Sequence, residues 1–204
     1  MAALINPGFG RKRPAGNPDR IPPGQYETQD FPVLSAGPTP RIPLLNWSFA
    51  LDGLVEAPVQ WSWKQFAALP HEPFTNDIHC VTKWSKLDTR RAGVSLDTLL
   101  AHVTLKPEAE FVMAYCHGVY TTNIPLADLR GGKAFVGVTF EGKPLTPEHG
   151  GPARLVVPHL YFWKSAKWIK GLRFMAADEA GFWEENGYSL YGDPWKEQRY
   201  RSDD

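Results

Sequence analysis

The residues of this sequence with the clearest chemical potential lie in one stretch, residues 77–85, which reads DIHCVTKWS. If Cys80 ends a strand, its side chain projects at the edge of a sheet with Lys83 and Trp84 beside it. A thiolate in that position can act as a nucleophile or as a metal ligand. The alternative is structural, because a free cysteine is commonly a small buried apolar side chain. The stretch alone leaves both interpretations open.

A zinc site is a second hypothesis, because His79-Cys80 and Cys116-His117 offer two histidine–cysteine pairs. Adjacent residues on a strand point to opposite faces of a sheet, so neither pair easily supplies two ligands to one ion. The sequence contains neither C-x-x-C nor H-x-x-x-H spacing, which disfavours structural zinc. The G-x-S-x-G pattern of serine hydrolases and the C-x-x-C-H pattern of c-type haem attachment are also absent.

A second stretch, residues 149–169, concentrates basic residues around a Gly-Gly turn. His149, Arg154, Lys164 and Lys167 fall within it. Glycine lets a backbone approach a ligand closely, and arginine and lysine suit a phosphate as a fork and as a point charge. The alternative is a loop that carries solvated basic side chains.

The elements that must position these residues are mostly strands. Ser62 and Ser95 are plausible N-caps, for a short helix that ends before Pro70 and for an amphipathic helix with an apolar face from Leu96 to Val103. Another short helix is expected over residues 126–129. Apolar runs and alternation predict strands over residues 47–51, 111–116, 120–124, 134–140, 154–157, 168–169 and 172–175. Few and short helices predict an α+β fold with a mixed β-sheet core.

Composition defines the class of protein and its organisation. The 22 basic and 22 acidic residues balance, which argues against a nucleic-acid binder, and no apolar run has the length of a membrane span. Two cysteines and an N-terminus without an apolar leader favour a cytoplasmic protein. Nine of the 19 prolines lie in the first 45 residues, which predicts an extended, partly flexible arm over residues 1–29 and one domain over residues 30–204.

Several motifs, in this order, resemble the oxidoreductase molybdopterin-binding domain of the sulfite oxidase family, in its soluble bacterial stand-alone branch. They cover residues 30–200, and they read DFPVL at 30–34, LDGLV at 51–55, HCVTKWS at 79–85, HGGP at 149–152 with Arg154, KSAKWI at 164–169 and GFWE at 181–184. The resemblance implies a single molybdopterin-binding catalytic domain, whose fold is mixed α+β without a dinucleotide-binding core.

The resemblance also implies the cofactor and its ligands. A mononuclear molybdenum is held by one pyranopterin dithiolene, and Cys80 stands where the family's protein ligand to the metal stands. A soft thiolate suits that soft metal–dithiolene unit. Lys83 and Trp84 would lie beside the metal. The remaining implied contacts to the pterin and its phosphate are Asp30 and Phe31 in a covering loop, with His149, Arg154, Ser165, Ala166 and Lys167.

One departure from the family bears on the substrate. Animal and plant sulfite oxidases place arginines shortly after the ligand cysteine, whereas this chain has lysines at positions 83 and 86. Lysine cannot grip an anion bidentately. We therefore expect two-electron oxygen-atom transfer on a small oxo-substrate other than sulfite, with Trp84 and Tyr120 as pocket walls. A separate electron-transfer protein is expected because no haem, flavin or iron–sulfur motif is present. Two alternatives are a non-catalytic module that holds molybdopterin, and a thiol or zinc domain in which Cys80 binds no molybdenum.

Overall fold

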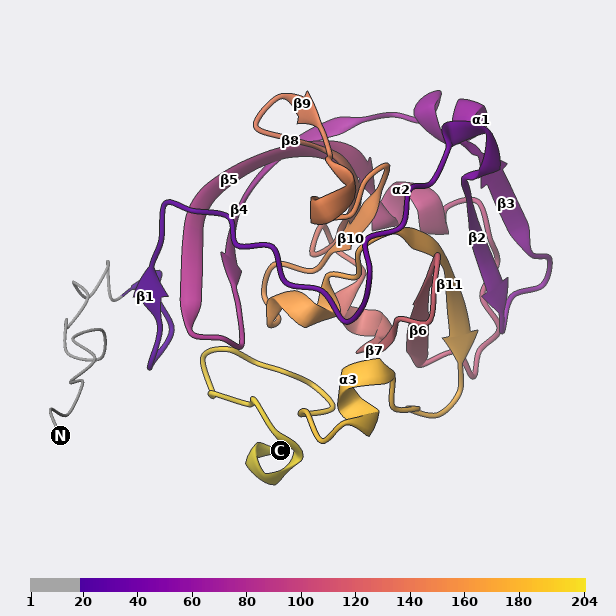
Figure 1. Cartoon of the computed structure of the whole chain (residues 1–204). Helices are drawn as coiled ribbons and strands as arrows, with labels where there is room; N and C mark the ends of the chain where they lie inside the picture. Colours follow the sequence, from indigo (N-terminus) through magenta and orange to yellow (C-terminus); the bar gives the residue numbers. More distant parts are fainter. Residues whose placement is uncertain (1–18) are drawn as a thin grey trace, which may run out of the picture.

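Two β-sheets form the body of the protein, as the computed structural model of residues 19–204 shows (Figure 1). The first sheet has the order β1-β5-β8-β10, with β4 paired to β5 and β9 paired to β8; the second has the order β3-β2-β11-β6-β7. The strands are β1 (Tyr26–Glu27), β2 (Ser48–Gly53), β3 (Val59–Ser62), β4 (Glu72–His79), β5 (Trp84–Ser95), β6 (Phe111–Cys116), β7 (Thr121–Pro125), β8 (Phe135–Phe140), β9 (Lys143–Pro144), β10 (Arg154–Val156) and β11 (Ile169–Met175).

Both sheets are mixed. β1 runs parallel to β5, and β11 runs parallel to β2, while the other pairs are antiparallel. Buried and half-buried side chains alternate along β6. The buried side chains of β6 belong to one large apolar core that also includes Trp47, Phe49 and Phe174. The prediction of an α+β fold with a mixed sheet core is thereby confirmed.

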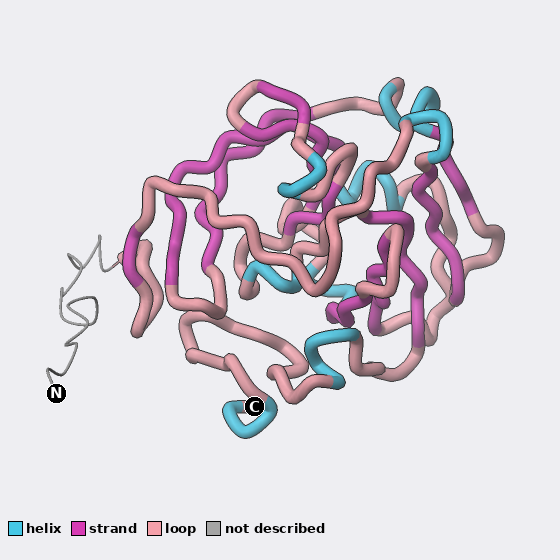
Figure 2. Tube along the Cα trace, in the orientation of Figure 1, coloured by secondary structure: helices cyan, strands magenta, loops and turns pink. Residues whose placement is uncertain are grey.

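The helices are short and lie scattered among the strands and loops (Figure 2). They are α1 (Trp63–Ala67), α2 (Leu96–Leu100) and α3 (Phe182–Glu185), with 3-10 turns at Leu44–Asn46, Leu126–Asp128, Pro147–His149, Phe162–Lys164 and Arg201–Asp203. Within the described residues, no helix combines the length and the apolar character that a membrane crossing requires.

Both predicted N-caps are present. The Ser62 side chain accepts from Gln65 N in a capping box, and the Ser95 side chain accepts from Thr98 N. The second predicted helix was too long, because after Ala101 the backbone bonds span only three residues, as in the bond from Val103 N to Leu100 O. The predicted helix at 126–129 is a 3-10 turn for the same reason.

The β4–β5 hairpin was not predicted from the sequence, and it is the element that carries Cys80. β5 is 12 residues long and pairs with β1, β4 and β8. Gly93 of β5 lies so close to β8 that a Cβ atom would overlap the Val136 carbonyl oxygen. A glycine is therefore required where these two strands meet.

The N-terminal segment from residue 19 onward lies on the body. β1 pairs with β5, and Arg20 binds both Asp77 and Asp88 at 2.6 Å. The first 18 residues of the predicted arm lie outside the described residues. The division at residue 29 stays a prediction. No helix or strand lies between β1 and the 3-10 turn that begins at Leu44, and residues 19–43 are called the arm below (Figure 1).

Candidate active site

Cys80 follows the last residue of β4 and opens the tight turn that leads into β5. Its backbone N–H donates to Trp84 O at 2.8 Å, and Lys83 N donates to Cys80 O at 3.0 Å. Lys83 closes the turn with a positive φ of 73°. The residue Cys80 is 6% exposed, and its sulfur lies 3.1 Å from Thr82 Oγ1. Burial raises the pKa of the thiol, against the opposing effects of Thr82 and Arg199.

Two distant parts of the chain hold the Cys80 turn in place. Gln25, from the arm, donates to Cys80 O at 3.1 Å and accepts a bond from Ser85 Oγ at 3.0 Å. Arg199, near the C-terminus, donates to Val81 O at 3.0 Å. Contacts from the N-terminal arm and from the C-terminal part of the chain therefore fix the turn, in addition to the hydrogen bonds of the hairpin itself.

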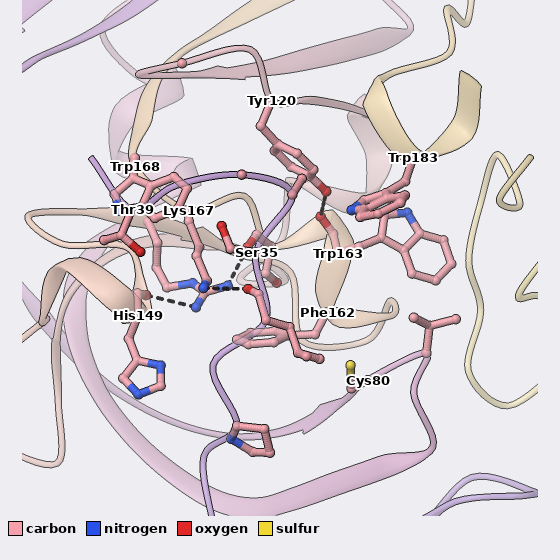
Figure 3. A pocket seen from close by; sticks show the side chains of 18 of the residues that line it. Ser35, Thr39, Cys80, Tyr120, His149, Phe162, Trp163, Lys167, Trp168 and Trp183 are labelled. Carbon is pink, nitrogen blue, oxygen red and sulfur yellow. Dashed lines mark hydrogen bonds between the residues drawn. The ribbon is translucent and has the colours of Figure 1, made fainter. Parts of the chain in front are cut away.

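A cavity of about 640 Å³ opens beside Cys80 (Figure 3), a size typical of small-molecule and cofactor sites. Five segments line it: the arm over residues 31–40, the Cys80 turn, residues 117–120, part of the stretch 149–168, and Trp183 with Tyr188. The arm thus forms one wall of the cavity, and the two stretches singled out in the sequence meet across it.

Arg154 forms the centre of a basic end of the cavity. The residue is 1% exposed, and its Nη1 and Nη2 atoms donate to His149 O at 3.0 Å and to Ser165 O at 2.5 Å. Its Nε atom has no partner among the described residues. Burial, followed by the charge of Arg91, lowers the pKa of Arg154. Such a guanidinium is poised to receive an anion.

Two further cations lie near this end. Lys167 donates to Leu34 O at 2.7 Å and to Glu148 O at 2.6 Å, and burial lowers its pKa to about 8. Arg91 is buried with three unpartnered nitrogen atoms, and its guanidinium packs near phenylalanine rings. In the described part of the chain, no ion pair involves Arg91, Arg154 or Lys167. The site therefore holds a buried positive charge that the chain does not compensate.

Other residues that line the cavity also carry buried polar atoms without a partner. Trp84 Nε1 and His117 Nε2 are buried and have no hydrogen-bond partner among the described residues, like Arg154 Nε. Buried polar groups of proteins are normally paired. The residues around this one cavity therefore carry polar groups that the described chain leaves unpaired, as expected around a site for a polar ligand.

The imidazole of His149 stacks on Phe31 of the arm, with ring centroids 3.9 Å apart and planes at 3°. Burial lowers the pKa of His149 to about 4, and the cations Arg154, Lys167 and Arg91 act in the same direction. The ring is therefore neutral at pH 7 and can stack without the cost of burying a further charge.

We expect this shifted pKa to make stability depend on pH. Between its ordinary pKa near 6.5 and about 4, His149 binds a proton in the unfolded chain and not in the folded chain. The free energy of unfolding of cofactor-free protein should therefore fall as pH is lowered through this range. Urea unfolding at pH 7 and pH 5 measures the fall, and His149→Gln should show a smaller one. An identical pH dependence in both proteins would contradict the assignment.

The predicted site residues divide into two groups. Cys80, Trp84, Phe31, His149, Arg154, Ser165 and Lys167 all line the cavity. Asp30 and Lys83 are exposed and do not line it, and Ala166 is buried behind Ser165. The positive φ of Lys83 gives that residue a structural place in the turn.

The sequence interpretation missed several residues of the site. Arg91, whose guanidinium packs on Phe31 and Phe162, lies on β5, an element that was not predicted. His117, Trp163, Trp183 and Tyr188 line the cavity. The sequence placed His117 in a candidate zinc pair and Trp183 in the GFWE motif, but it gave neither residue a role in this site. Within residues 19–204 there is no cluster of three or more potential metal-ligating histidine, cysteine or acidic side chains. Cys116 belongs to the large apolar core, away from the Cys80 turn.

Comparison with known proteins shows which proteins the chain is similar to. The uncharacterized oxidoreductase YuiH of Bacillus subtilis strain 168 is 42% identical over 196 residues, which span 96% of this chain and 99% of YuiH. The sulfite oxidase of Arabidopsis thaliana is 26% identical over 76% of this chain and 49% of its own length. A putative protein-methionine-sulfoxide reductase subunit, YedZ1 of Azospira oryzae, is 29% identical over 71% of this chain and 56% of its own length.

Among solved structures, the sulfane dehydrogenase SoxCD from Paracoccus pantotrophus has a similar fold. Its TM-score is 0.62 at 22% identity, over 68% of this chain and 40% of that one. Residues 36–183 match the protein family described as oxidoreductase molybdopterin binding domain. The chain therefore belongs to this sulfite oxidase-like family of molybdopterin-binding oxidoreductases, whose cofactor is molybdenum–molybdopterin.

Proposed function

We propose that this protein catalyses two-electron oxygen-atom transfer at a mononuclear molybdenum centre that Cys80 and one pyranopterin dithiolene coordinate. The observation that carries the proposal is the cavity itself, in which the Cys80 turn and unpaired buried donors share one space. A cofactor with a soft metal at one end and a phosphate at the other matches a thiol at one end and uncompensated cations at the other.

Cys80 would be the protein's ligand to the metal. A metal-bound cysteine is deprotonated, and Thr82 and Arg199 favour that form against the effect of burial. The bound cofactor supplies a metal that cycles between its hexavalent and tetravalent states and exchanges an oxygen atom with the substrate. Hydrogen bonds from the side chains of Gln25 and Arg199 to the carbonyl oxygens of Cys80 and Val81 would hold the Cys80 turn in one position around the metal.

The basic end would hold the pterin and its phosphate. Arg154 Nε and the ammonium of Lys167 are the charged donors, and Ser165 contributes through the turn that carries it. Ser165 Oγ accepts a bond from Val157 N at 2.9 Å, which fixes that turn. Phe31 covers His149 and so would exclude water from this part of the site.

Two partners follow from this proposal. The substrate is a small oxo compound, and electrons reach or leave the metal through a separate electron-transfer protein, because the sequence carries no haem, flavin or iron–sulfur motif. The named relatives include a sulfite oxidase and a putative methionine-sulfoxide reductase subunit, which supports sulfur oxo chemistry.

Metal and pterin analysis combined with turnover tests this proposal. Purified protein should contain about one molybdenum and one pterin per chain, and it should oxidise a reduced viologen in the presence of an S-oxide or N-oxide. Full loading without turnover of any oxo-substrate would instead identify a module that only holds the cofactor. Zinc, or no metal, in protein from a host that makes molybdopterin would contradict the molybdenum assignment.

We expect Arg154→Ala and Lys167→Ala to lower cofactor occupancy while activity per bound molybdenum stays near normal. Hydrogen bonds to charged groups contribute about 1.5–3 kcal/mol each, so either loss should weaken retention roughly ten- to a hundredfold. The measurement is the ratio of molybdenum and pterin to protein after extensive dialysis. Full occupancy in the double variant would show that these cations do not hold the cofactor.

A further inference from the structure

The two ends of the cavity differ in chemical character (Figure 3). His149 and Lys167 lie on one side, whereas Trp163 and Trp183 lie on the side of Cys80. The first side is the basic end, which the proposed function assigns to the pterin and its phosphate. The second side is free to receive a substrate beside the metal ligand.

Three aromatic residues form this second side, which we call the aromatic wall: Trp163, Trp183 and Tyr188. The Tyr188 ring lies 5.2 Å from Trp163 at 85° and 5.0 Å from Trp183 at 35°. Trp183 and Tyr188 are half-buried, so part of each ring faces the cavity. Tyr188 lines the same cavity as Cys80.

The aromatic wall is held rigidly from behind. Trp163 Nε1 donates to Glu184 Oε1 at 2.9 Å, and the same oxygen accepts from Lys164 Nζ at 2.6 Å. Trp183 directly precedes Glu184 on α3, so the buried carboxylate fixes both indoles through one short helix. A rigid apolar surface binds flat groups at a low cost in conformational entropy.

No described cation lines the cavity beside the aromatic wall. Lys83 is exposed and does not line the cavity, and Arg199 already donates to Val81 O and to Glu197. The faces of aromatic rings carry partial negative charge and disfavour anions. An anionic substrate would therefore lose its hydration at this end without gaining an ionic partner.

We propose that the substrate is a neutral oxo compound that carries an aromatic ring, and that Trp183 selects for this ring. The inference rests on the proposed function. Sulfoxides and N-oxides of this kind share a polar S–O or N–O bond next to an aryl group. In the reductive direction that bond breaks and sulfur or nitrogen keeps the electron pair. Two equivalents of a one-electron donor supply two electrons, and with two protons the oxygen leaves as water.

The test compares substrates on purified holoenzyme of measured molybdenum and pterin content, with reduced methyl viologen as donor. Methyl phenyl sulfoxide is compared with dimethyl sulfoxide, and quinoline N-oxide with trimethylamine N-oxide. In at least one pair, kcat/KM should favour the aryl compound by about tenfold, the scale of one aromatic contact. 4-(Methylsulfinyl)benzoate, which adds only a carboxylate to the aryl sulfoxide, should be a poorer substrate than its neutral parent by about the same factor.

Variants of Trp183 assign the selectivity to one residue. In Trp183→Leu the aryl-to-alkyl ratio should fall towards one, mainly through KM for the aryl compound, whereas Trp183→Phe should keep most of it. Trp63→Ala, which removes a half-buried indole of α1 that does not line the cavity, should leave the ratio unchanged. Calorimetric binding of methyl phenyl sulfone, a sulfoxide mimic, to the holoenzyme should weaken in Trp183→Leu and not in Trp63→Ala.

The outcomes separate this inference from the proposed function. Turnover without an aryl preference, equal use of the carboxylate analogue, or a ratio that survives in Trp183→Leu would each overturn the inference and leave the proposed function standing. Fully loaded enzyme that turns over none of the five compounds would contradict the proposed function as well.

Discussion

Cys80→Ser should lose nearly all turnover while the protein keeps its fold. Removing a group that only supports a metal ligand already lowers metal affinity or activity about 10–100-fold. Removing the ligand itself should therefore lower activity by more than roughly a hundredfold. The substitution changes one small side chain in a turn whose shape rests on backbone bonds to Trp84 O and from Lys83 N. Pterin should therefore stay bound, and the molybdenum absorption spectrum should change. Turnover assays, metal analysis and circular dichroism measure these three results.

Cys116→Ser is the matched control. Cys116 is also buried, and burial raises the pKa of its thiol to about 12, which favours an inert side chain. The residue lies at the end of β6 and packs in the large core. The variant should keep its activity per molybdenum and lose only a little stability. Equal loss of activity from both substitutions would contradict a site with one cysteine ligand.

Breaking the buried pair of Lys164 and Glu184 should have the largest effect on stability. Both side chains are fully buried, and Lys164 Nζ lies 2.6 Å from Glu184 Oε1. Removing one partner of such a pair costs about 3–5 kcal/mol, because the other charge stays buried without compensation. Lys164→Met should therefore lower Tm by about 6–20 °C, as measured by calorimetry.

An exposed ion pair provides the control for this prediction. Arg90 and Glu141 approach to 2.7 Å, but the Arg90 side chain is 74% exposed. Exposed pairs contribute about 0–1 kcal/mol, so Arg90→Ala should change Tm by no more than about 4 °C. A similar loss in both variants would mean that burial does not make the Lys164–Glu184 pair special.

The sequence predicted the fold class and most strands because their apolar residues alternate or cluster. It did not predict β4 and β5, because their residues, such as Thr75, Asp77, Arg90 and Arg91, are largely polar. These strands pair with each other over a long register, and β5 also pairs with β8, so tertiary hydrogen bonding and not local preference defines them.

The candidate site was predictable where a motif carried the residue and not elsewhere. His149, Arg154 and Lys167 lie within a compact basic stretch. Trp183 belongs to the GFWE motif, but neither it nor Tyr188 was assigned to the site, because both reach the cavity from the C-terminal part of the chain. Their position depends on Glu184, which accepts bonds from Thr122 Oγ1 as well as from Trp163 and Lys164. Such long-range polar contacts leave no periodic signal in a sequence.

The contacts that secure the Cys80 turn also bear on the order of folding. Gln25 and Cys80 are 55 residues apart, and Arg199 and Val81 are 118 residues apart. Lys167 and Leu34, which close the arm over the cavity, are separated by 133 residues. Closing long loops has an entropic cost before any contact compensates it, and chains rich in such contacts fold slowly. The hairpin can therefore form early, while the cavity wall is completed only after the two ends of the chain have come together.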